Sequence, residues 1–395
     1  MKNPFYFFVA MIILFSSCKK TNHSTTPATP EPTKEIINSL ISGSDCLHFA
    51  RLFKGYKMEN IQSVKQTKDG GYIFCGSTET IAASESDILI IKTDCFGKTE
   101  WMRTFSNSYS DFGYDITPLS SGGYFITANF SIDPSYWKII RHKGQFILLD
   151  SAGTFLSKQD CTAGSATYLR KTIETTDGIF LTCGHDENNG NFILKTDLRG
   201  NQYWVKYFGN AGLSDIALHN NNYLACGSTI INNKEAIYLA EMDEDGDTLW
   251  TKSIDKNIKG SASSIAILNN NEIAIGGTYR TSNTTFAGFV MRLDATGKEI
   301  WYRSLEAEDL QSLVDISGTI NNDIVTVVNR PAGGLNMIKL NFDTGSIIWN
   351  VNKPSNSSIQ DFQLTVDEGF IAVGRSFEPG GNLEGYVLKT DKNGD

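Results

Sequence analysis

The sequence predicts an all-β fold, a seven-bladed β-propeller of four-stranded blades, and three observations lead to it. Trp204, Trp250, Trp301 and Trp349 lie 46, 51 and 48 residues apart, and a repeat of roughly 50 residues is typical of propellers rather than helical solenoids. A phrase with a Gly, Asn or Asp turn followed by apolar residues occurs seven times. With 35 Gly and 20% charged residues, the composition suits many short strands joined by tight turns.

The seven phrases predict the second strand of each blade. They are GGYIFCGST from Gly70, GGYFITANF from Gly122, DGIFLTCGH from Asp177, NNYLACGST from Asn221, NNEIAIGGT from Asn270, NNDIVTVVN from Asn321 and EGFIAVGRS from Glu368. In each blade a first strand precedes the phrase, a third strand follows it, and an Asp-x-x-Gly turn leads to a fourth strand. The stretch LDATGKEIWYRSL, from Leu293, contains this turn and the Trp that follows it.

The two ends of the repeat array complement each other. The stretch GYVLKTDKNGD, residues 385–395, reads as a third strand and its turn without a fourth strand, whereas CLHFARLFKG, residues 46–55, reads as a fourth strand without a third. We therefore expect residues 49–53 to pair antiparallel with residues 386–390. This pairing completes the seventh blade and removes an open sheet edge.

The Asp-x-x-Gly turns and their tryptophans are interpreted as structural. The Gly supplies a positive φ in the outer hairpin, and the Trp packs one blade on the next rather than stacking on a ligand. Residues 243–247 and 391–395 also resemble a shortened calcium loop, but they lack its full length and its distal Glu. Asp-rich hairpin turns explain them, and we expect no metal site.

The repeats LDATGKEIW and NFDTGSIIW resemble the tryptophan-docking repeat of quinoprotein (PQQ-like) propellers, and the whole set resembles bacterial SBBP-type repeats. The likeness covers residues 46–395 and implies the propeller fold rather than an activity. Quinoproteins of this family typically have eight blades, and their alcohol dehydrogenases carry an adjacent Cys-Cys pair that this sequence lacks. We therefore expect no quinone and no other cofactor.

The N-terminal region predicts export and lipidation. Residues 1–17 have the pattern of a signal peptide, and Leu14 to Cys18 resemble a bacterial lipobox in which Cys18 is acylated. The alternative is an ordinary cleaved signal with an incidental Cys. Residues 18–44, rich in Thr, Pro and Ser, predict a disordered tether before a propeller at 45–395. These features predict a lipid-anchored protein in the envelope of a Gram-negative, Bacteroidota-like bacterium, at the outer membrane.

Charge and residue content exclude or disfavour several functions. The formal net charge of −9 argues against nucleic-acid binding, because there is no basic surplus to neutralise phosphates. No nucleophile elbow, phosphate-binding loop or zinc-protease motif occurs, and the five His are scattered singly. Cys75, Cys183 and Cys226 occupy the same repeat position and are expected to pack in the core. The exported compartment permits disulfides, but the spacing of the cysteines does not settle which of them pair.

Four carboxylates are candidates for a site in the central channel. Asp115, Asp215, Asp315 and Asp361 occupy one position near the start of the first strands, and the other blades place Ser63, Thr172 and Ser264 there. Repeat symmetry gathers the carboxylates at one end of the channel, where they would suit a cation or a basic peptide. The alternative is that each Asp caps the backbone of its own loop.

A second candidate site is the surface around the longest loop, residues 131–144. It contains Tyr136, Trp137 and Arg141, and the neighbouring connection adds Tyr109 and Phe112. Exposed aromatic rings beside basic groups suit a contact with a protein or a glycan. The alternative is that the loop packs locally on its own blade.

These features favour a monomeric, non-enzymatic scaffold that binds a protein or glycan partner and contacts the membrane only through lipid on Cys18. The alternative is a propeller-type lyase or hydrolase that acts on polysaccharide with the channel carboxylates. An enzyme would need acid and base groups that converge in one pocket.

Overall fold

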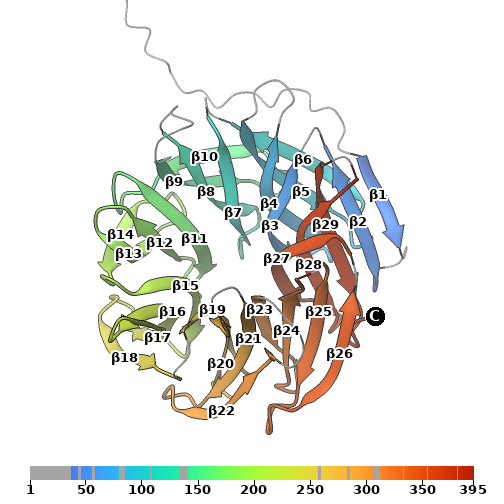
Figure 1. The fold of residues 1–395 in the computed structure, drawn as a ribbon. Coiled ribbons are helices and arrows are strands. Elements are labelled where there is room, and N and C mark those ends of the chain that lie inside the picture. Colours follow the sequence, from blue (N-terminus) through green and yellow to red (C-terminus); the bar gives the residue numbers. More distant parts are fainter. Residues whose placement is uncertain are drawn as a thin grey trace, which may run out of the picture.

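The computed structural model describes residues 37–42, 46–55, 58–79, 85–106, 109–132, 141–256, 259–282, 285–306, 312–331, 333–353, 355–379 and 381–395. Within these ranges the chain forms seven antiparallel sheets arranged in a ring (Figure 1). The seven-bladed propeller predicted from the repeats is confirmed. No helix in the described ranges has the length and apolar character needed to cross a membrane.

In six blades four strands follow sequence order from the channel outward, and the seventh blade takes its outer strands from the N-terminal part of the chain. The innermost strands are β3 (Glu59–Gln66), β7 (Asp111–Pro118), β11 (Thr167–Glu174), β15 (Gly212–His219), β19 (Lys259–Ile267), β23 (Ser312–Gly318) and β27 (Ser357–Leu364). The second strands are β4 (Tyr72–Glu79), β8 (Tyr124–Ser131), β12 (Phe180–Asp186), β16 (Asn222–Ile231), β20 (Ile273–Arg280), β24 (Ile324–Asn329) and β28 (Phe370–Phe377).

The outer half of each blade contains the third and fourth strands. The third strands are β5 (Ser86–Thr93), β9 (His142–Leu149), β13 (Gly190–Thr196), β17 (Lys234–Met242), β21 (Phe286–Leu293), β25 (Leu335–Leu340) and β29 (Leu383–Thr390). The outer strands are β6 (Thr99–Phe105), β10 (Phe155–Asp160), β14 (Gln202–Tyr207), β18 (Thr248–Ile254), β22 (Glu299–Ser304), β26 (Ile347–Lys353) and β2 (Phe49–Lys54). We call the face where the innermost strands begin the upper face, and the opposite one the lower face.

The N-terminal strand closes the ring as predicted. Strand β2 pairs antiparallel with β29, with Phe49 opposite Lys389 and Phe53 opposite Gly385. A further strand, β1 (Ile37–Ser42), pairs antiparallel with the outer edge of β2. The tether expected at residues 18–44 is therefore wrong for residues 37–42, because the unpaired backbone groups on the edge of β2 can pair with them.

The tryptophans pack between blades, against the Gly of the next turn. A methyl group on Gly153 would lie 2.8 Å from the ring of Trp101, and one on Gly345 would lie 2.8 Å from Trp301. Both glycines have a positive φ, 75° and 64° respectively. In the closing strand Phe49 takes the place of the Trp and packs against Gly97 of the first blade in the same way.

The cysteines have two different roles. Cys46, just before β2, forms a disulfide with Cys95 in the turn between β5 and β6, so a covalent bond joins the last blade to the first. Cys75, Cys161, Cys183 and Cys226 are free and buried. This confirms core packing for the three cysteines that share a repeat position.

Candidate functional site

Each innermost strand carries a β-bulge at the same repeat position. In β7 the register shifts between Gly113 and Asp115, and in β11 it shifts between Leu169 and Lys171. A bulge places an extra residue on one strand and re-aims its side chains. The bulged residues are Gln62, Tyr114, Arg170, Ser214, Ser263, Val314 and Gln360. The residues that follow them, here called the channel ring, are Ser63, Asp115, Lys171, Asp215, Ser264, Asp315 and Asp361.

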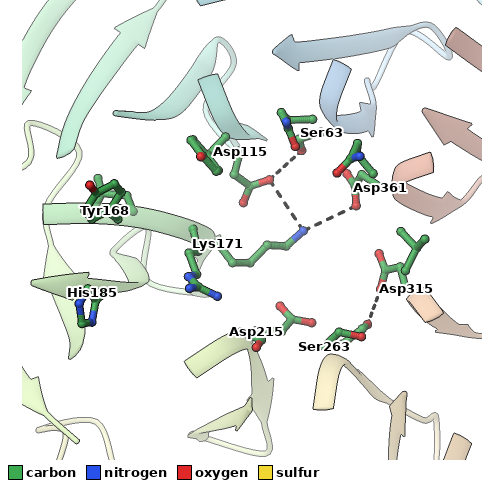
Figure 2. Close-up of a pocket in the computed structure, with 17 residues that line it drawn as sticks. Ser63, Asp115, Tyr168, Lys171, His185, Asp215, Ser263, Asp315 and Asp361 are labelled. Atoms are coloured by element: carbon green, nitrogen blue, oxygen red, sulfur yellow. Dashed lines mark hydrogen bonds and ion pairs between the residues drawn. The ribbon is translucent and has the colours of Figure 1, made fainter. Parts of the chain in front are cut away.

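Both sets line one pocket of about 480 Å³ in the centre of the propeller (Figure 2). Tyr168, Leu169 and His185 complete its wall. Tyr168 lies at the start of β11 and His185 near the end of β12, so these two side chains mark the upper side of the pocket. The structure therefore brings together the four carboxylates that the sequence placed at the end of the channel.

One position of the channel ring differs from the sequence prediction. Thr172 was expected to be the equivalent of the four aspartates in the third blade, but the bulge places Lys171 there. Thr172 instead lies between its own blade and the preceding one. Its hydroxyl group is 2.6 Å from the hydroxyl of Thr127 in the preceding blade and 2.8 Å from that of Thr182 in its own. The other blades have an apolar residue at the position of Thr172, directly after the channel-ring residue. Because Thr172 is polar, the sequence comparison placed it one position too early, in the channel ring.

The carboxylates connect neighbouring blades. Oδ2 of Asp115 accepts a hydrogen bond from the backbone N–H of Thr172 at 2.8 Å, and Oδ1 accepts one from the hydroxyl of Ser63 at 2.7 Å. Oδ2 of Asp215 accepts from the backbone N–H of Ile265 at 2.9 Å. These donors belong to other blades, so the carboxylates join neighbouring blades. Asp215 also accepts from the backbone N–H of Ile216 in its own strand at 2.9 Å, which is the role that the alternative gives it.

Asp361 and Asp315 also connect innermost strands of neighbouring blades. Oδ2 of Asp361 accepts from the backbone N–H of Val64 at 2.9 Å, which joins the last blade to the first. Asp315 accepts from the hydroxyl of Ser264 in the preceding blade and from the backbone N–H of Ile316. Hydrogen bonds between innermost strands therefore stabilise the ring around the pocket.

Positive charge is distributed unevenly around the channel ring. The ammonium of Lys171 lies 3.8 Å from Oδ1 of Asp115 and 4.0 Å from Oδ1 of Asp361, and that of Lys65 lies 3.3 Å from Asp361. Figure 2 shows Lys171 reaching across the pocket toward these two carboxylates. Among the described residues, no Lys, Arg or His nitrogen lies within 4.0 Å of Asp215 or Asp315.

The pKa values follow this distribution. Burial raises the pKa of Asp315 to about 7, and the negative charge of Asp361 acts in the same direction. Burial also raises the pKa of Asp215. For Asp361 the effect of burial is outweighed by Lys65, Lys171 and the N–H of Val64, which lower the pKa to about 2. Burial opposes the charge of Lys171, but the surrounding carboxylates hold the pKa of its ammonium well above the usual range.

Aromatic rings extend from the pocket to the predicted contact surface. The ring of Tyr168 lies 4.9 Å from that of His142, and His142 lies 6.0 Å from Phe112, measured between centroids. Phe112 and Tyr109 are half-buried. Arg141 is exposed, and its Nε lies 3.7 Å from a carboxylate oxygen of Glu187. These residues share the upper face.

Tyr136 and Trp137, the other two residues of the predicted contact surface, lie outside the described residues. Among the described charged or titratable residues that line the pocket, the sequence prediction missed Arg170, Lys171 and His185. A signal for Lys171 was present, since Leu-Arg-Lys-Thr-Ile in β11 aligns with Gly-Tyr-Asp-Ile-Thr in β7 once the bulge is counted. A register set by a bulge is not visible from hydrophobic alternation alone.

The aspartates of the supposed calcium loops serve their own turns. Oδ1 of Asp243 accepts from the backbone N–H groups of Asp245 and Asp247 at 3.1 and 2.8 Å. Oδ1 of Asp391 accepts in the same way from Asn393 at 2.8 Å and Asp395 at 3.1 Å. This is the hairpin-turn role expected from the sequence.

Comparisons with known proteins give the fold and no family. No protein-family model matches the chain, and no curated protein matches it. A chain of the mitotic checkpoint complex is similar with a TM-score of 0.55 and 10% identity, over 99% of this chain and 100% of the other.

Two other solved structures are similar. Chaetomium thermophilum Sqt1 bound to the N-terminus of ribosomal protein L10 has a TM-score of 0.51 and 9% identity, over 86% of this chain and 98% of the other. Drosophila Plexin A in complex with Semaphorin 1b has a TM-score of 0.52 and 8% identity, over 92% and 88%. At such low identity these likenesses show the fold alone.

Proposed function

We propose that the chain is a non-enzymatic binding lipoprotein of a Gram-negative envelope, and that its upper face holds a protein or glycan partner at the mouth of the central channel. The observation that carries this proposal is the continuity of the upper face. A polar pocket of about 480 Å³ and a row of aromatic rings formed by Tyr168, His142 and Phe112 lie next to each other there. Binding sites combine such a concave polar region with aromatic contact area.

The floor of the pocket supports binding because it is rigid. Asp115, Asp215 and Asp361 are each held by a backbone N–H of the next blade. Side chains that are fixed in this way lose little conformational freedom when a partner arrives, which favours affinity. Tyr114 and Arg170, which are exposed, line the same pocket and are available for contact.

The similar folds support a protein partner as one of the two options. Sqt1 is described as bound to the N-terminus of ribosomal protein L10, and Plexin A as in complex with Semaphorin 1b. The proposed anchor is lipid on Cys18, which lies outside the described residues. Strand β1 begins at the upper face, since Ile37 pairs with Lys54 at the end of β2, so the proposed tether joins the propeller on the side of the pocket.

Site-specific photo-crosslinking in cells tests the binding face. A photoreactive amino acid at Tyr109, Phe112 or Arg141 should crosslink a defined partner, because these side chains lie on the upper face. The matched controls are Phe96 and Val366, which are 45% and 87% exposed in turns of the lower face. Crosslinks that form only from the lower face, or equally from both faces, would contradict the proposal.

One observation favours the second candidate, a lyase or hydrolase acting on polysaccharide. The raised pKa of Asp315, about 7, is in the range that suits a general acid or base near neutral pH. If the chain releases reducing or unsaturated sugar ends from a polysaccharide, Asp315→Asn should abolish that release without unfolding the protein. Turnover that survives this change would exclude Asp315 as the acid or base.

A further inference from the structure

The pocket contains hydrogen-bonding groups that the protein does not use. The ammonium of Lys171 has three donors, yet its nearest carboxylate oxygens lie at 3.8 and 4.0 Å, beyond hydrogen-bond distance. No hydrogen bond from this ammonium to another described residue is found. Its side chain is 26% exposed, and it points into the pocket (Figure 2). A ligand oxygen in the pocket would complete its hydrogen bonding.

The opposite side of the channel ring has hydrogen-bond acceptors that are only partly used. Asp215 and Asp315 each accept hydrogen bonds from backbone or hydroxyl groups. A carboxylate has about four lone-pair positions, so both retain acceptor capacity. No described Lys, Arg or His nitrogen lies within 4.0 Å of either. Donor groups on a ligand would therefore find acceptors on this side.

The mixture of charges in so small a space selects against charged ligands. A small cation that approached Asp215 and Asp315 would share the pocket with the Lys171 ammonium. A small anion that approached Lys171 would meet four carboxylates. Like charges at such distances repel strongly where water is partly excluded. A neutral molecule that carries donors and acceptors side by side avoids both penalties, and hydroxyl groups have this property.

Size and the aromatic side chains agree with this chemistry. A pocket of about 480 Å³ falls within the range of small-molecule sites. Tyr114, which is 38% exposed, and Tyr168 line it beside the carboxylates. Phenol rings can pack on the C–H face of a ring while their hydroxyls remain hydrated. Ser214 adds a further neutral side chain to the lining.

We propose that the central pocket binds a neutral, hydroxyl-rich ring, such as the terminal unit of a glycan, between Lys171 on one side and Asp215 and Asp315 on the other. A ring oxygen or hydroxyl accepts from Lys171, and hydroxyl groups donate to the two carboxylates. This inference rests on the proposed binding function of the upper face and narrows its ligand class to a carbohydrate.

Saturation-transfer NMR and titration calorimetry on the purified full chain test the proposal. The probes are glucose, galactose, mannose, N-acetylglucosamine, rhamnose, lactose, cellobiose and chitobiose. At least one of these sugars should bind the wild type. Lys171→Met should raise the Kd of that sugar at least about tenfold, because the substitution removes a charge-assisted hydrogen bond. The matched control is Lys206→Met. Lys206 lies on the outer strand β14, outside the pocket, and forms an ion pair with Asp247.

A second variant protects the test against misfolding. Tyr114 is exposed, so Tyr114→Ala should leave the melting temperature nearly unchanged and still weaken the sugar several-fold. Photo-crosslinking from Arg141 is measured on the chain without either substitution, and it reports a protein partner whether or not a sugar binds the pocket. The failure of sugar binding and the failure of the upper-face proposal are therefore separate outcomes.

Three results would overturn the inference. One is that no probe binds at about 10 mM, a concentration that detects even weak sites. Another is that a zwitterion or a cation, tested as glycine and as lysine methyl ester, binds while the neutral sugars do not. The third is that Lys171→Met and Lys206→Met bind the same sugar equally well.

Discussion

At the scale of the residue, seven bulged strands decide what the channel presents. Each bulge directs one side chain into the channel ring, and four of the seven are aspartates. The same aspartates accept hydrogen bonds from the adjacent blade, so one residue type both joins the blades and sets the chemistry of the pocket. The single lysine in the ring, Lys171, lies beside only two of them, Asp115 and Asp361, and leaves the other half acidic.

This asymmetry predicts an unusual dependence of stability on pH. Asp315 has a pKa of about 7 in the folded protein, above its ordinary value of 3.8, so the folded state holds a proton that the unfolded state releases between these pH values. The free energy of unfolding should therefore fall as pH rises from about 4 to 7, by up to about 4 kcal/mol from this group. Urea unfolding of the wild type and of Asp315→Asn across this range measures it, and the variant should have a shallower slope.

Asp361 is the control residue for this prediction, because its contribution to stability changes with pH in the opposite direction. Asp361 has a pKa of about 2, below its ordinary value, so its contribution is present above pH 4 and is lost as pH falls toward 2. Asp361→Asn should therefore remove the loss of stability on the acid side of the profile. It should also make the slope between pH 4 and 7 shallower, because the negative charge of Asp361 helps to raise the pKa of Asp315. Equal slopes in wild type and Asp315→Asn would show that Asp315 is ionised throughout.

At the scale of the element, the outer hairpin is the unit that fits blade to blade. The carboxylate of Asp294 accepts from the backbone N–H groups of Thr296 and Lys298, at 2.9 Å each, which fixes the turn. Gly297 at its tip packs against Trp250 of the preceding blade. The indole N–H of Trp301 then donates to the carbonyl of Phe342 in the following blade at 2.8 Å. The repeated phrase therefore makes both the turn and its docking surface.

Substitutions at two glycines distinguish the free-energy cost of straining the turn backbone from the cost of disturbing the Trp packing. Gly345 and Gly178 both have a positive φ. A methyl group added at Gly345 would lie 2.8 Å from the ring of Trp301, whereas one added at Gly178 would have no neighbour within 4 Å. Gly178→Ala should cost about 1–2 kcal/mol from backbone conformation alone. Gly345→Ala should cost about 2–4 kcal/mol, because Trp301 must also move. Chemical denaturation of the two variants checks this, and equal losses would mean that the Trp does not dock tightly.

At the scale of the whole molecule, the ring is closed by segments far apart in the sequence. Strand β2 pairs with β29, β1 covers the outer edge of β2, and the Cys46–Cys95 disulfide links the region before β2 to the first blade. Phe49 docks on Gly97 across the same junction. The junction between the last and first blades is thus held by strand pairing, packing and a covalent bond.

The disulfide should have a measurable share in closure. It spans 49 residues, and closing a loop of that length restricts the unfolded chain by about 4 kcal/mol. Dithiothreitol should therefore lower the melting temperature of the oxidised wild type by several degrees. Cys46→Ser should melt at the lower temperature with or without the reductant. A wild type that is insensitive to reduction would mean that the bond adds nothing to closure.

The proposed anchor is tested by changing one residue. Cys18→Ser should abolish labelling by a fatty-acid probe and release the protein from the membrane fraction, because a stable anchor of this kind depends on the attached chains. Immunoblots of membrane and soluble fractions give the readout. Retention in the membrane fraction, without lipid label, would point to a tightly bound membrane partner.

The sequence by itself determined the number of blades, the position of the second strands, the closure by residues 49–53 and the docking role of the tryptophans. Each of these depends on a local pattern that repeats, so turns, alternation and spacing carry the information. The sequence also gathered Asp115, Asp215, Asp315 and Asp361 at one position, because repeat symmetry maps equivalent residues around the axis.

Only the tertiary structure decided which groups share the pocket and in which state. A bulge changes the register by one residue without changing the amino-acid composition. The channel ring therefore contains Lys171 where the sequence predicted Thr172. Three features depend on contacts between residues that are distant in the sequence. They are the addition of β1 to the sheet, the disulfide between Cys46 and Cys95, and the raised pKa of Asp315. Charges act through space and through local burial, and no linear pattern records the distance from Lys171 to each carboxylate.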